Sequence, residues 1–265
     1  MEIRSRSPVI YQIICVFVFL LFYTLSLASV SHEKDFPFIS GEKLEYDLSW
    51  GFIPVGKATL EIWGGNPRLA EEWKILFFVR TNDFADAFYK VRTRVWSEVD
   101  HNFTKSLSYK KDQQEGKTQK MIDVSFDYQK KQSYYSENDS KPIVLNLEER
   151  VFDPMAITYA FRMNQMVSGE KRTIPTSDGK KLLQVEINVG KNESVRVPFG
   201  KFGAHAAIPK LKNLSGVFKK SPKGILKVWY SSDARRLPLK ISSKVVVGSF
   251  TAKLRKATKL KNINN

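Results

Sequence analysis

The fold of this chain is decided first by the stretch Leu44-Glu45-Tyr46-Asp47-Leu48-Ser49-Trp50. Its apolar residues stand at every second position with polar residues between them, which is the period of a strand that buries one face. Residues 51–56 contain two glycines and one proline, and they predict a turn. The alternation resumes at Ala58, Leu60 and Ile62, so the whole segment predicts a β-hairpin.

The strand pattern recurs along the rest of the chain. Further strands are predicted at residues 73–79, 91–95, 106–111, 119–128, 132–136, 182–189, 194–197, 204–208, 225–230, 239–247 and 249–254. One or two helical turns are predicted between residues 83 and 89. Many short strands at close spacing, without long helices between them, favour an antiparallel sheet that bends or closes to protect its edges. We therefore expect a mainly β fold, either a strongly curved antiparallel sheet or an open β-barrel.

One segment departs from the strand pattern. Asp153 can cap a helix, Pro154 suits the first helical position, and Ser168-Gly169 is a natural stop. The residues between them are apolar on nearly every side, so we predict one helix at about 153–167. The segment is rich in methionine. Methionine fills irregular cores and also lines sites that bind variable apolar ligands. The helix is expected either to lie in the core or to cover an apolar cavity as a lid.

The N-terminus has the features of a cleavable signal peptide. Two arginines precede an uncharged apolar run from Ile13 to Tyr23, and small residues stand at Ser26 and Ala28. The run is too short to cross a bilayer comfortably. We expect residues 1–28 to be a signal peptide that is cut after about Ala28, with an uncleaved membrane anchor as the alternative.

Removal of this leader would also remove the single cysteine, Cys15. The mature chain would then have no disulfide, no thiol nucleophile and no thiolate metal ligand, and its stability would come from burial. We expect residues 29–254 to form a single β-rich domain that works outside the cytoplasm. Residues 255–265 are basic and are expected to be a disordered tail.

The net charge of +16 is unevenly distributed. From Ser194 to the end there are seventeen lysines and arginines against one acid, Asp233, whereas residues 29–193 hold twenty-four basic and twenty-five acidic side chains. Such a positive surface could meet the phosphates of an anionic envelope surface, although a solvated face without a partner is the alternative. The expected export and the lack of zinc-finger or RNA-binding motifs argue against nucleic acid.

Residues that build common catalytic sites are sparse. The three histidines, His32, His101 and His205, stand far apart, and no pair of them has metal-ligand spacing. No serine occupies a G-x-S-x-G turn, and there is no glycine-rich phosphate loop. We therefore predict no catalytic residue, no cofactor and no metal site. A glycan hydrolase with two facing carboxyl groups is a third reading, because a sequence gives no distance between acids.

Four ordered motifs resemble one protein family. They are Gly41–Trp50 continuing through Ile53–Ala58, Phe152–Ala156 followed by Tyr159–Arg162, Val228–Asp233, and Arg235–Lys240. Together they resemble the domain of unknown function 3108 (DUF3108) family of exported bacterial envelope proteins, over about residues 38–254. The resemblance implies export to the periplasm of a Gram-negative bacterium, and it implies no activity or catalytic residue.

A looser resemblance concerns the fold. The last third of the chain, with a tryptophan-bearing strand, a turn and then Leu237–Lys240, is similar to the open-barrel lipoprotein carriers of the periplasm. That likeness implies a curved sheet around acyl chains beneath a helical lid, and function does not follow from fold.

We interpret the chain as a non-enzymatic periplasmic protein that holds a lipid or another lipophilic ligand in the concave face of its sheet. The predicted lining residues are Tyr46, Trp50, Trp73, Phe77, Met155, Tyr159 and Met163. The residues predicted to meet an anionic headgroup are Lys219, Lys220 and Lys223. The alternative is an envelope interaction or assembly module with a solid core. The sequence does not indicate the ligand, the protein partners or the oligomeric state.

Overall fold

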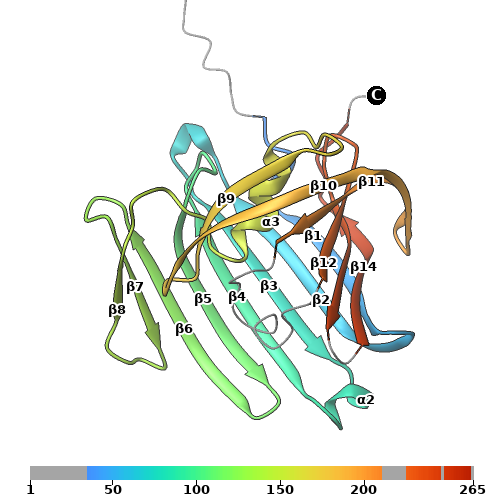
Figure 1. Ribbon diagram of the computed structural model, residues 1–265, viewed down its shortest axis with the longest axis horizontal. Coiled ribbons are helices and arrows are strands. Elements are labelled where there is room, and N and C mark those ends of the chain that lie inside the picture. Colours follow the sequence, from blue (N-terminus) through green and yellow to red (C-terminus); the bar gives the residue numbers. More distant parts are fainter. Residues whose placement is uncertain (1–34, 211–224, 246–247, 264–265) are drawn as a thin grey trace, which may run out of the picture. The chain divides into compact units, whose positions relative to one another are not determined.

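The described part of the chain folds into an antiparallel sheet of fourteen strands, and Figure 1 shows its arrangement. The computed structural model describes residues 35–210, 225–245 and 248–263. The expected signal peptide and the three lysines at 219, 220 and 223 lie outside the described residues. All packing and hydrogen bonds reported below lie within residues 35–263, which belong to one unit, Asp35–Asn265.

The first eight strands form a meander in which each strand pairs with the next. They are β1 (Glu42–Trp50), β2 (Ile53–Gly64), β3 (Trp73–Thr81), β4 (Val91–Val99), β5 (Ser106–Glu115), β6 (Thr118–Asp127), β7 (Gln132–Glu137) and β8 (Ile143–Asn146). A short 3-10 turn, η1 (Pro67–Leu69), connects β2 to β3, and a one-turn helix, α2 (Asp83–Asp86), connects β3 to β4.

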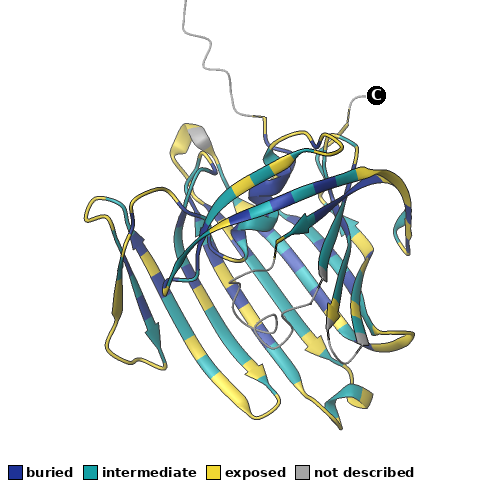
Figure 2. Cartoon of the chain, viewed as in Figure 1, coloured by how far each residue is buried: buried dark blue, intermediate teal, exposed yellow. Residues whose placement is uncertain are grey.

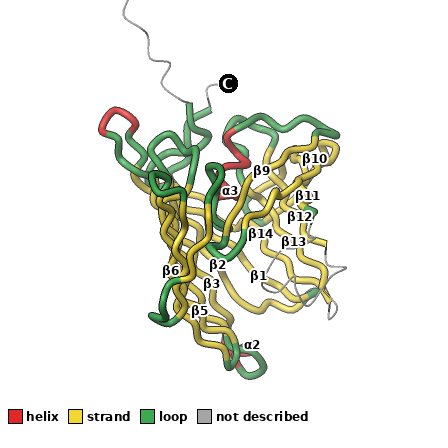
Figure 3. Tube along the Cα trace, turned by 60° about the vertical axis from the view of Figure 1, so that its left-hand side comes forward, coloured by secondary structure: helices red, strands yellow, loops and turns green. Residues whose placement is uncertain are grey.

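The last six strands form a second meander. They are β9 (Lys171–Ser177), β10 (Leu182–Val197), β11 (Gly200–Pro209), β12 (Ile225–Ser231), β13 (Pro238–Val245) and β14 (Gly248–Thr258). Strand β14 pairs with β1 and so joins the two meanders into one sheet with β8 and β9 at its ends. Figure 3 shows β9, β10 and β11 bent round to face β1–β6, with α3 (Ala156–Ala160) between them. The predicted curved, open antiparallel sheet is confirmed.

Several strands differ from the sequence-based expectation. The expected turn at residues 51–56 is shorter, because β2 already begins at Ile53. The expected strands at 182–189 and 194–197 are one strand, β10, with a shift of register between Val189 and Asn192. Strands β8 and β9 were not predicted, since β8 has only four residues and β9 contains Pro175 and shows no clear alternation.

The expectation of a disordered tail from residue 255 is wrong for its first part. Strand β14 continues to Thr258 and pairs with Lys43, Leu44 and Glu45 of β1. A register shift between Glu45 and Tyr46 accommodates this extension. The physical reason is that the start of β1 would otherwise leave its backbone groups without partners on that side. Basic composition alone does not reveal such pairing.

The predicted helix is present but shorter than 153–167. Helix α3 is followed by a 3-10 turn, η2 (Phe161–Met163), and the chain is extended at Asn164. The Arg172 guanidinium donates to the carbonyl groups of Phe161, Asn164 and Gln165, which satisfies acceptors that the end of a helix leaves free. The extended chain then places Met166 in the core cluster formed by β10, β11 and β12.

Within the described residues the core consists of three clusters of buried side chains, and the helical segment contacts all of them. Figure 2 shows buried positions, in dark blue, in α3 and along the strands around it. The main cluster holds Tyr159 and Ala160 of α3 against β1, β2, β3, β13 and β14. The second cluster, on β4–β7, packs against Met155. The third cluster, on β9–β12, contains Phe161. The helix therefore fills one part of the space enclosed by the bent sheet.

Candidate functional site

Three of the predicted lining residues are part of the packed core. Trp73 and Tyr159 are almost completely buried, and each contacts the Phe38 ring edge to face with a centroid distance of 5.0 Å. Tyr46 is also buried, and its hydroxyl donates to the carbonyl oxygen of Pro238 at 2.8 Å. These side chains fix α3 and the β13 end against β1 and β3.

The other four described lining residues are partly exposed. Phe77 and Met155 lie where the first and second core clusters meet, and Met163 packs against the first. Trp50 lies at the exposed end of β1, where its ring stacks on Phe250 at 6.3 Å. The structure therefore does not gather the predicted residues into one lining, and their assignment to a ligand stays a prediction.

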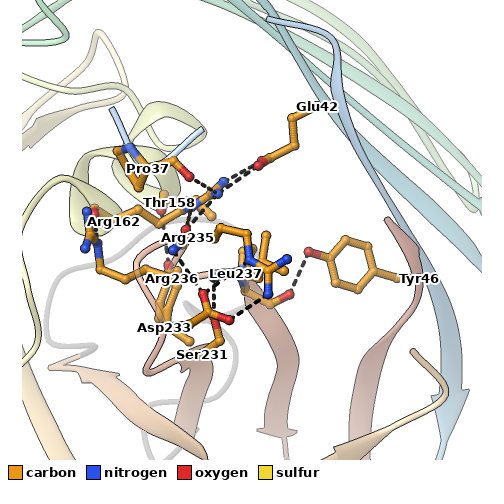
Figure 4. A network of polar contacts seen from close by, with 12 residues as sticks. Pro37, Glu42, Tyr46, Thr158, Arg162, Ser231, Asp233, Arg235, Arg236 and Leu237 are labelled. Atoms are coloured by element: carbon orange, nitrogen blue, oxygen red, sulfur yellow. Dashed lines mark hydrogen bonds and ion pairs between the residues drawn. The ribbon is translucent and has the colours of Figure 1, made fainter. Parts of the chain in front are cut away.

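A buried ion pair anchors the helical segment, and sequence reasoning missed it. The Arg162 guanidinium donates to both carboxylate oxygens of Glu42, at 2.6 Å and 2.9 Å, and neither side chain is exposed (Figure 4). Arg162 also donates to the carbonyl groups of Pro37 at 3.4 Å and of Arg235 at 3.0 Å. In the sequence, the one indication of this ion pair is an arginine within an otherwise apolar segment.

The residues from Ser231 to Leu237, which connect β12 to β13, extend this network of polar contacts around Arg162. The Ser231 hydroxyl donates to the Asp233 carboxylate and accepts from the Leu237 amide, at 3.1 Å and 2.8 Å (Figure 4). The Arg235 guanidinium pairs with Asp233 at 2.9 Å, and the Arg236 side chain donates to the Arg162 carbonyl. These contacts give the β12–β13 connection a structural role in holding the helical segment.

Asp153 caps α3 from a fully buried position, as its place in the sequence predicts. Its carboxylate accepts from the Met155 and Ala156 amides at 2.8 Å and 3.0 Å. It also accepts from the hydroxyl groups of Ser97 on β4 and Ser106 on β5, at 2.5 Å and 2.6 Å. Burial raises the pKa of the Asp153 carboxyl, and these four donors oppose that rise. The cap also attaches the helix to the sheet.

The core-facing side of the sheet becomes polar toward α2. Residues paired across an antiparallel sheet project to the same face, and register joins Phe77, Val95, Lys111, Ile122 and Glu137 in one row. Since Val95 and Ile122 belong to the second core cluster, this row faces inward. The inner polar zone, as we name it, consists of Thr93, Lys111, Gln113, Glu115, Lys120 and Glu137.

Hydrogen bonds connect the members of the inner polar zone. Glu115 accepts from the Thr93 hydroxyl at 3.2 Å and from the Gln113 amide at 3.0 Å, and Lys111 lies 4.0 Å from its carboxylate. Burial lowers the pKa of the Lys111 ammonium. Lys111, Gln113 and Glu115 are alternate residues of β5, but only the pairing register shows that their side chains point inward.

Glu137 forms the second half of the zone. It pairs with Lys120 and accepts from the Tyr135 hydroxyl at 2.7 Å, and Lys180 of the β9–β10 connection lies 3.4 Å away. The hydrogen bonds from Lys120 and Tyr135 lower the pKa of Glu137 to about 2. The zone can therefore offer both cationic donors and carboxylate acceptors to a polar group at the inner face.

Other chemistry is sparse in the described parts of the chain. His205 approaches the Gly190 carbonyl and Asn192, while His101 lies beside Asn102, so the two do not form a pair. Residues 35–210, 225–245 and 248–263 contain no group of three or more histidines, cysteines and acids that could hold a metal ion. Within the same residues no helix has the length and apolar character needed to cross a membrane.

Comparison with solved structures supports the barrel-like fold. The chain is similar to a β-barrel-like protein of domain of unknown function DUF1849 from Brucella abortus, with a TM-score of 0.58 and 11% identity, over 84% of this chain and 99% of that one. A hypothetical protein, CT021 from Chlamydia trachomatis, gives a TM-score of 0.35 at 11% identity, over 85% and 93% of the two chains.

A third structure is a putative exported protein with a YmcC-like fold from Bacteroides fragilis, with a TM-score of 0.38 and 9% identity, over 84% and 98% of the two chains. The last two TM-scores are too low to support a shared fold. No curated protein matches the chain.

The family model described as a protein of unknown function, DUF3108, matches residues 45–255. This range contains most of the described sheet, the helical segment and the inner polar zone. The motif-based resemblance to this family is therefore confirmed, and the family description names no catalytic activity. The chain belongs to the DUF3108 family of proteins of unknown function.

Proposed function

We propose that this protein is a non-enzymatic, exported envelope protein that holds a lipophilic ligand with a polar end on the concave face of its sheet. The ligand lies on the part of the inner face between α3 and the β3–β4 connection. Export to the periplasm is part of the proposal, and the signal-peptide features of residues 1–28 support it.

One observation carries the proposal. On the η1 side the inner face is filled by buried aromatic rings, whereas toward α2 it bears half-buried residues of mixed character, including Phe77, Val79, Lys111 and Gln113. Charged groups on the core side of a sheet are costly unless water or a polar partner solvates them. An apolar chain could lie on Phe77 and Val79 while its polar end meets the inner polar zone.

Native mass spectrometry of the mature protein, purified gently from its own envelope, tests this proposal. We expect a co-purified mass that departs on delipidation. The variant Ile122→Glu places a charge among the inner-face residues of β6 and should abolish the extra mass. Ser125→Glu places the same charge on the exposed face of that strand and should retain it. Ligand-free spectra in repeated preparations would refute the proposal.

An interaction or assembly module is the second candidate, and the edge of the sheet favours it. Among the strands that the structure describes, β8 pairs only with β7, and its Ile143 and Val144 are exposed. An open edge can add a strand from another chain, although four residues offer few backbone groups. A stable complex with another protein that Val144→Lys disrupts, together with ligand-free spectra, would select this candidate.

A further inference from the structure

One end of the sheet carries a group of exposed apolar side chains. The β1–β2, β3–β4 and β5–β6 connections lie at this end because alternate turns of a meander share an end, along the lower side of Figure 1. The aromatic rim, as we name this group, consists of Trp50, Phe52, Ile53, Phe84, Phe88, Tyr89 and Phe250. Phe52 is completely exposed and Phe88 is 78% exposed. Isolated exposed apolar residues are ordinary, but a group of this size indicates an interaction surface.

The parts of the rim are held in place by the backbone beneath them. The Asn82 side-chain amide donates to the Pro54 carbonyl at 2.9 Å, which attaches the base of α2 to the β1–β2 hairpin. The Gly116 amide donates to the Lys90 carbonyl at 2.7 Å, which attaches the β5–β6 turn to the other side of α2. These bonds fix the backbone of the β1–β2, β3–β4 and β5–β6 connections relative to one another.

A cationic groove of about 700 Å³ adjoins the rim, and Phe52 is part of its wall. Four cations, Lys57, Arg80, Arg92 and Lys253, and two acids, Asp47 and Asp83, line it. Register places Lys253, Asp47, Lys57, Arg80 and Arg92 in one row across five strands. Because Tyr46 and Leu48 face the core, this row lies on the opposite face of the sheet.

The row sets like charges beside one another. Lys57 is paired in register with Arg80, and Arg80 with Arg92, an arrangement that destabilises a sheet unless a counter-charge is present. Arg92 has one, since it pairs with Asp86 at 2.6 Å. In the described part of the chain no carboxylate forms an ion pair with Lys57, Arg80 or Lys253. The groove therefore has the charge to receive an anion from outside.

We propose that this end of the protein docks on an anionic lipid bilayer, with Phe52 and Phe88 entering the headgroup region and the groove binding lipid phosphates. Aromatic side chains next to lysine and arginine match the chemistry of a membrane interface. The rim side chains come from the β1–β2 hairpin, the β3–β4 connection with α2, and the start of β14, all at one end of the sheet, where a bilayer can contact them together. A bilayer is therefore the partner that both the rim and the groove fit.

This docking goes beyond the proposed ligand binding and does not require it, since Phe52, Phe88 and the four cations of the groove are not members of the inner polar zone. The two proposals are related in space, because the inner polar zone lies toward the same α2 end of the strands. Docking would bring that zone close to the membrane.

Vesicle co-sedimentation of the mature chain, starting at Ser29, tests the docking. We expect binding to vesicles of equimolar phosphatidylcholine and phosphatidylglycerol, and much weaker binding to phosphatidylcholine alone. Phe52→Ser with Phe88→Ser should weaken binding by at least about tenfold. Leu69→Ser removes a side chain that is 75% exposed at the opposite end of the sheet and should have no effect.

Charge variants test the groove in the same assay. Lys57→Glu with Arg80→Glu should remove the preference for phosphatidylglycerol, whereas Lys74→Glu, an exposed residue nearer the other end of β3, should retain it. Calorimetry with inorganic phosphate separates the sources of the anion. Binding of phosphate without binding of vesicles would overturn the proposal and indicate a site for a free anion.

Site-specific labelling adds a readout that does not depend on affinity. The mature chain has no cysteine, so Phe52→Cys can carry a single environment-sensitive dye. We expect a blue shift of its emission on anionic vesicles, and none for the same dye on Leu69→Cys. Equal shifts at both positions, or no shift at position 52, would overturn the docking geometry. A loss of ligand in mass spectrometry with vesicle binding intact would refute only the proposed function.

Discussion

Arg162 and Glu42, 120 residues apart in the chain, form a two-point ion pair in which neither side chain is exposed (Figure 4). The pair joins the helical segment to the first strand of the sheet. Two charges taken out of water depend on each other, because either one alone would remain buried without compensation. The carbonyl groups of Pro37 and Arg235 satisfy further donors of the guanidinium.

Removal of one member of this pair should destabilise the protein strongly. We expect Glu42→Ala to lower the free energy of unfolding by about 3–5 kcal/mol, because it leaves the Arg162 charge buried. Urea unfolding measures this loss. Glu45→Ala on the same strand is the control, since Glu45 faces away from the core. Losses of equal size for the two variants would contradict the prediction, and Glu42→Met with Arg162→Met should cost less than Glu42→Ala.

The aromatic cluster around Phe38 should be equally sensitive to truncation. Phe38 is 1% exposed, and its ring lies 5.0–5.2 Å from the rings of Trp73, Phe103 and Tyr159. Phe38→Ala should cost about 3–5 kcal/mol through lost burial and the cavity that remains. Phe52→Ala removes the same group from a fully exposed position and should change stability by less than about 0.5 kcal/mol. Thermal unfolding compares the two, and a large effect at Phe52 would show that the rim is structural.

Two glycines separate backbone strain from packing. Gly179 in the β9–β10 connection and Gly169 have nearly the same φ, +85° and +83°. A Cβ atom at Gly179 would lie 2.7 Å from the Val124 side chain, whereas one at Gly169 would meet nothing within 4 Å. We expect Gly169→Ala to cost about 1 kcal/mol and Gly179→Ala about 1–3 kcal/mol more. Chemical denaturation measures both. Equal losses would mean that the connection does not pack on β6.

Glu137 should make the protein less stable in acid. The pKa of its carboxyl is lowered to about 2 in the folded protein from the ordinary value of 4.5, so the folded state favours the ionised form. The corresponding stability is present above about pH 5 and is lost as the pH falls toward about 2. With allowance for solvent screening the loss should be about 1 kcal/mol. Glu137→Gln should flatten this part of the profile, and Glu148→Gln, an exposed control, should not. If stability changed with pH in the same way for the unmodified protein, Glu137→Gln and Glu148→Gln, the prediction would be wrong.

Much of the fold could be predicted because it depends on local patterns. The alternation in residues 44–50 and 58–62 predicts two strands that the structure contains as parts of β1 and β2. Asp153 and Pro154 predict the start of the helical segment, since capping is a local interaction. The sequence does not predict the short strand β8, because four residues are too few to show an alternating pattern. It does not predict the end of β14 either, because the pairing partner of that segment lies in β1.

The candidate sites could not be predicted in the same way. Lys111 and Gln113 alternate with their neighbours like any strand residues, and only the pairing of β4, β5 and β6 shows that they face inward. The charge count of the last 72 residues pointed to a basic surface in that part of the chain. Three of the four cations of the groove, however, come from β2, β3 and β4, where the overall charge is balanced.

The sequence by itself determined that this protein is a curved antiparallel sheet of many short strands with one helical segment, because side-chain alternation, turn residues and helix caps act over a few neighbouring residues. Tertiary structure decided which charges are buried together, as in Arg162 and Glu42, and which lie side by side, as in Lys57 and Arg80. These relationships depend on the register between strands, and a shift of one residue would turn every side chain of a strand to the other face.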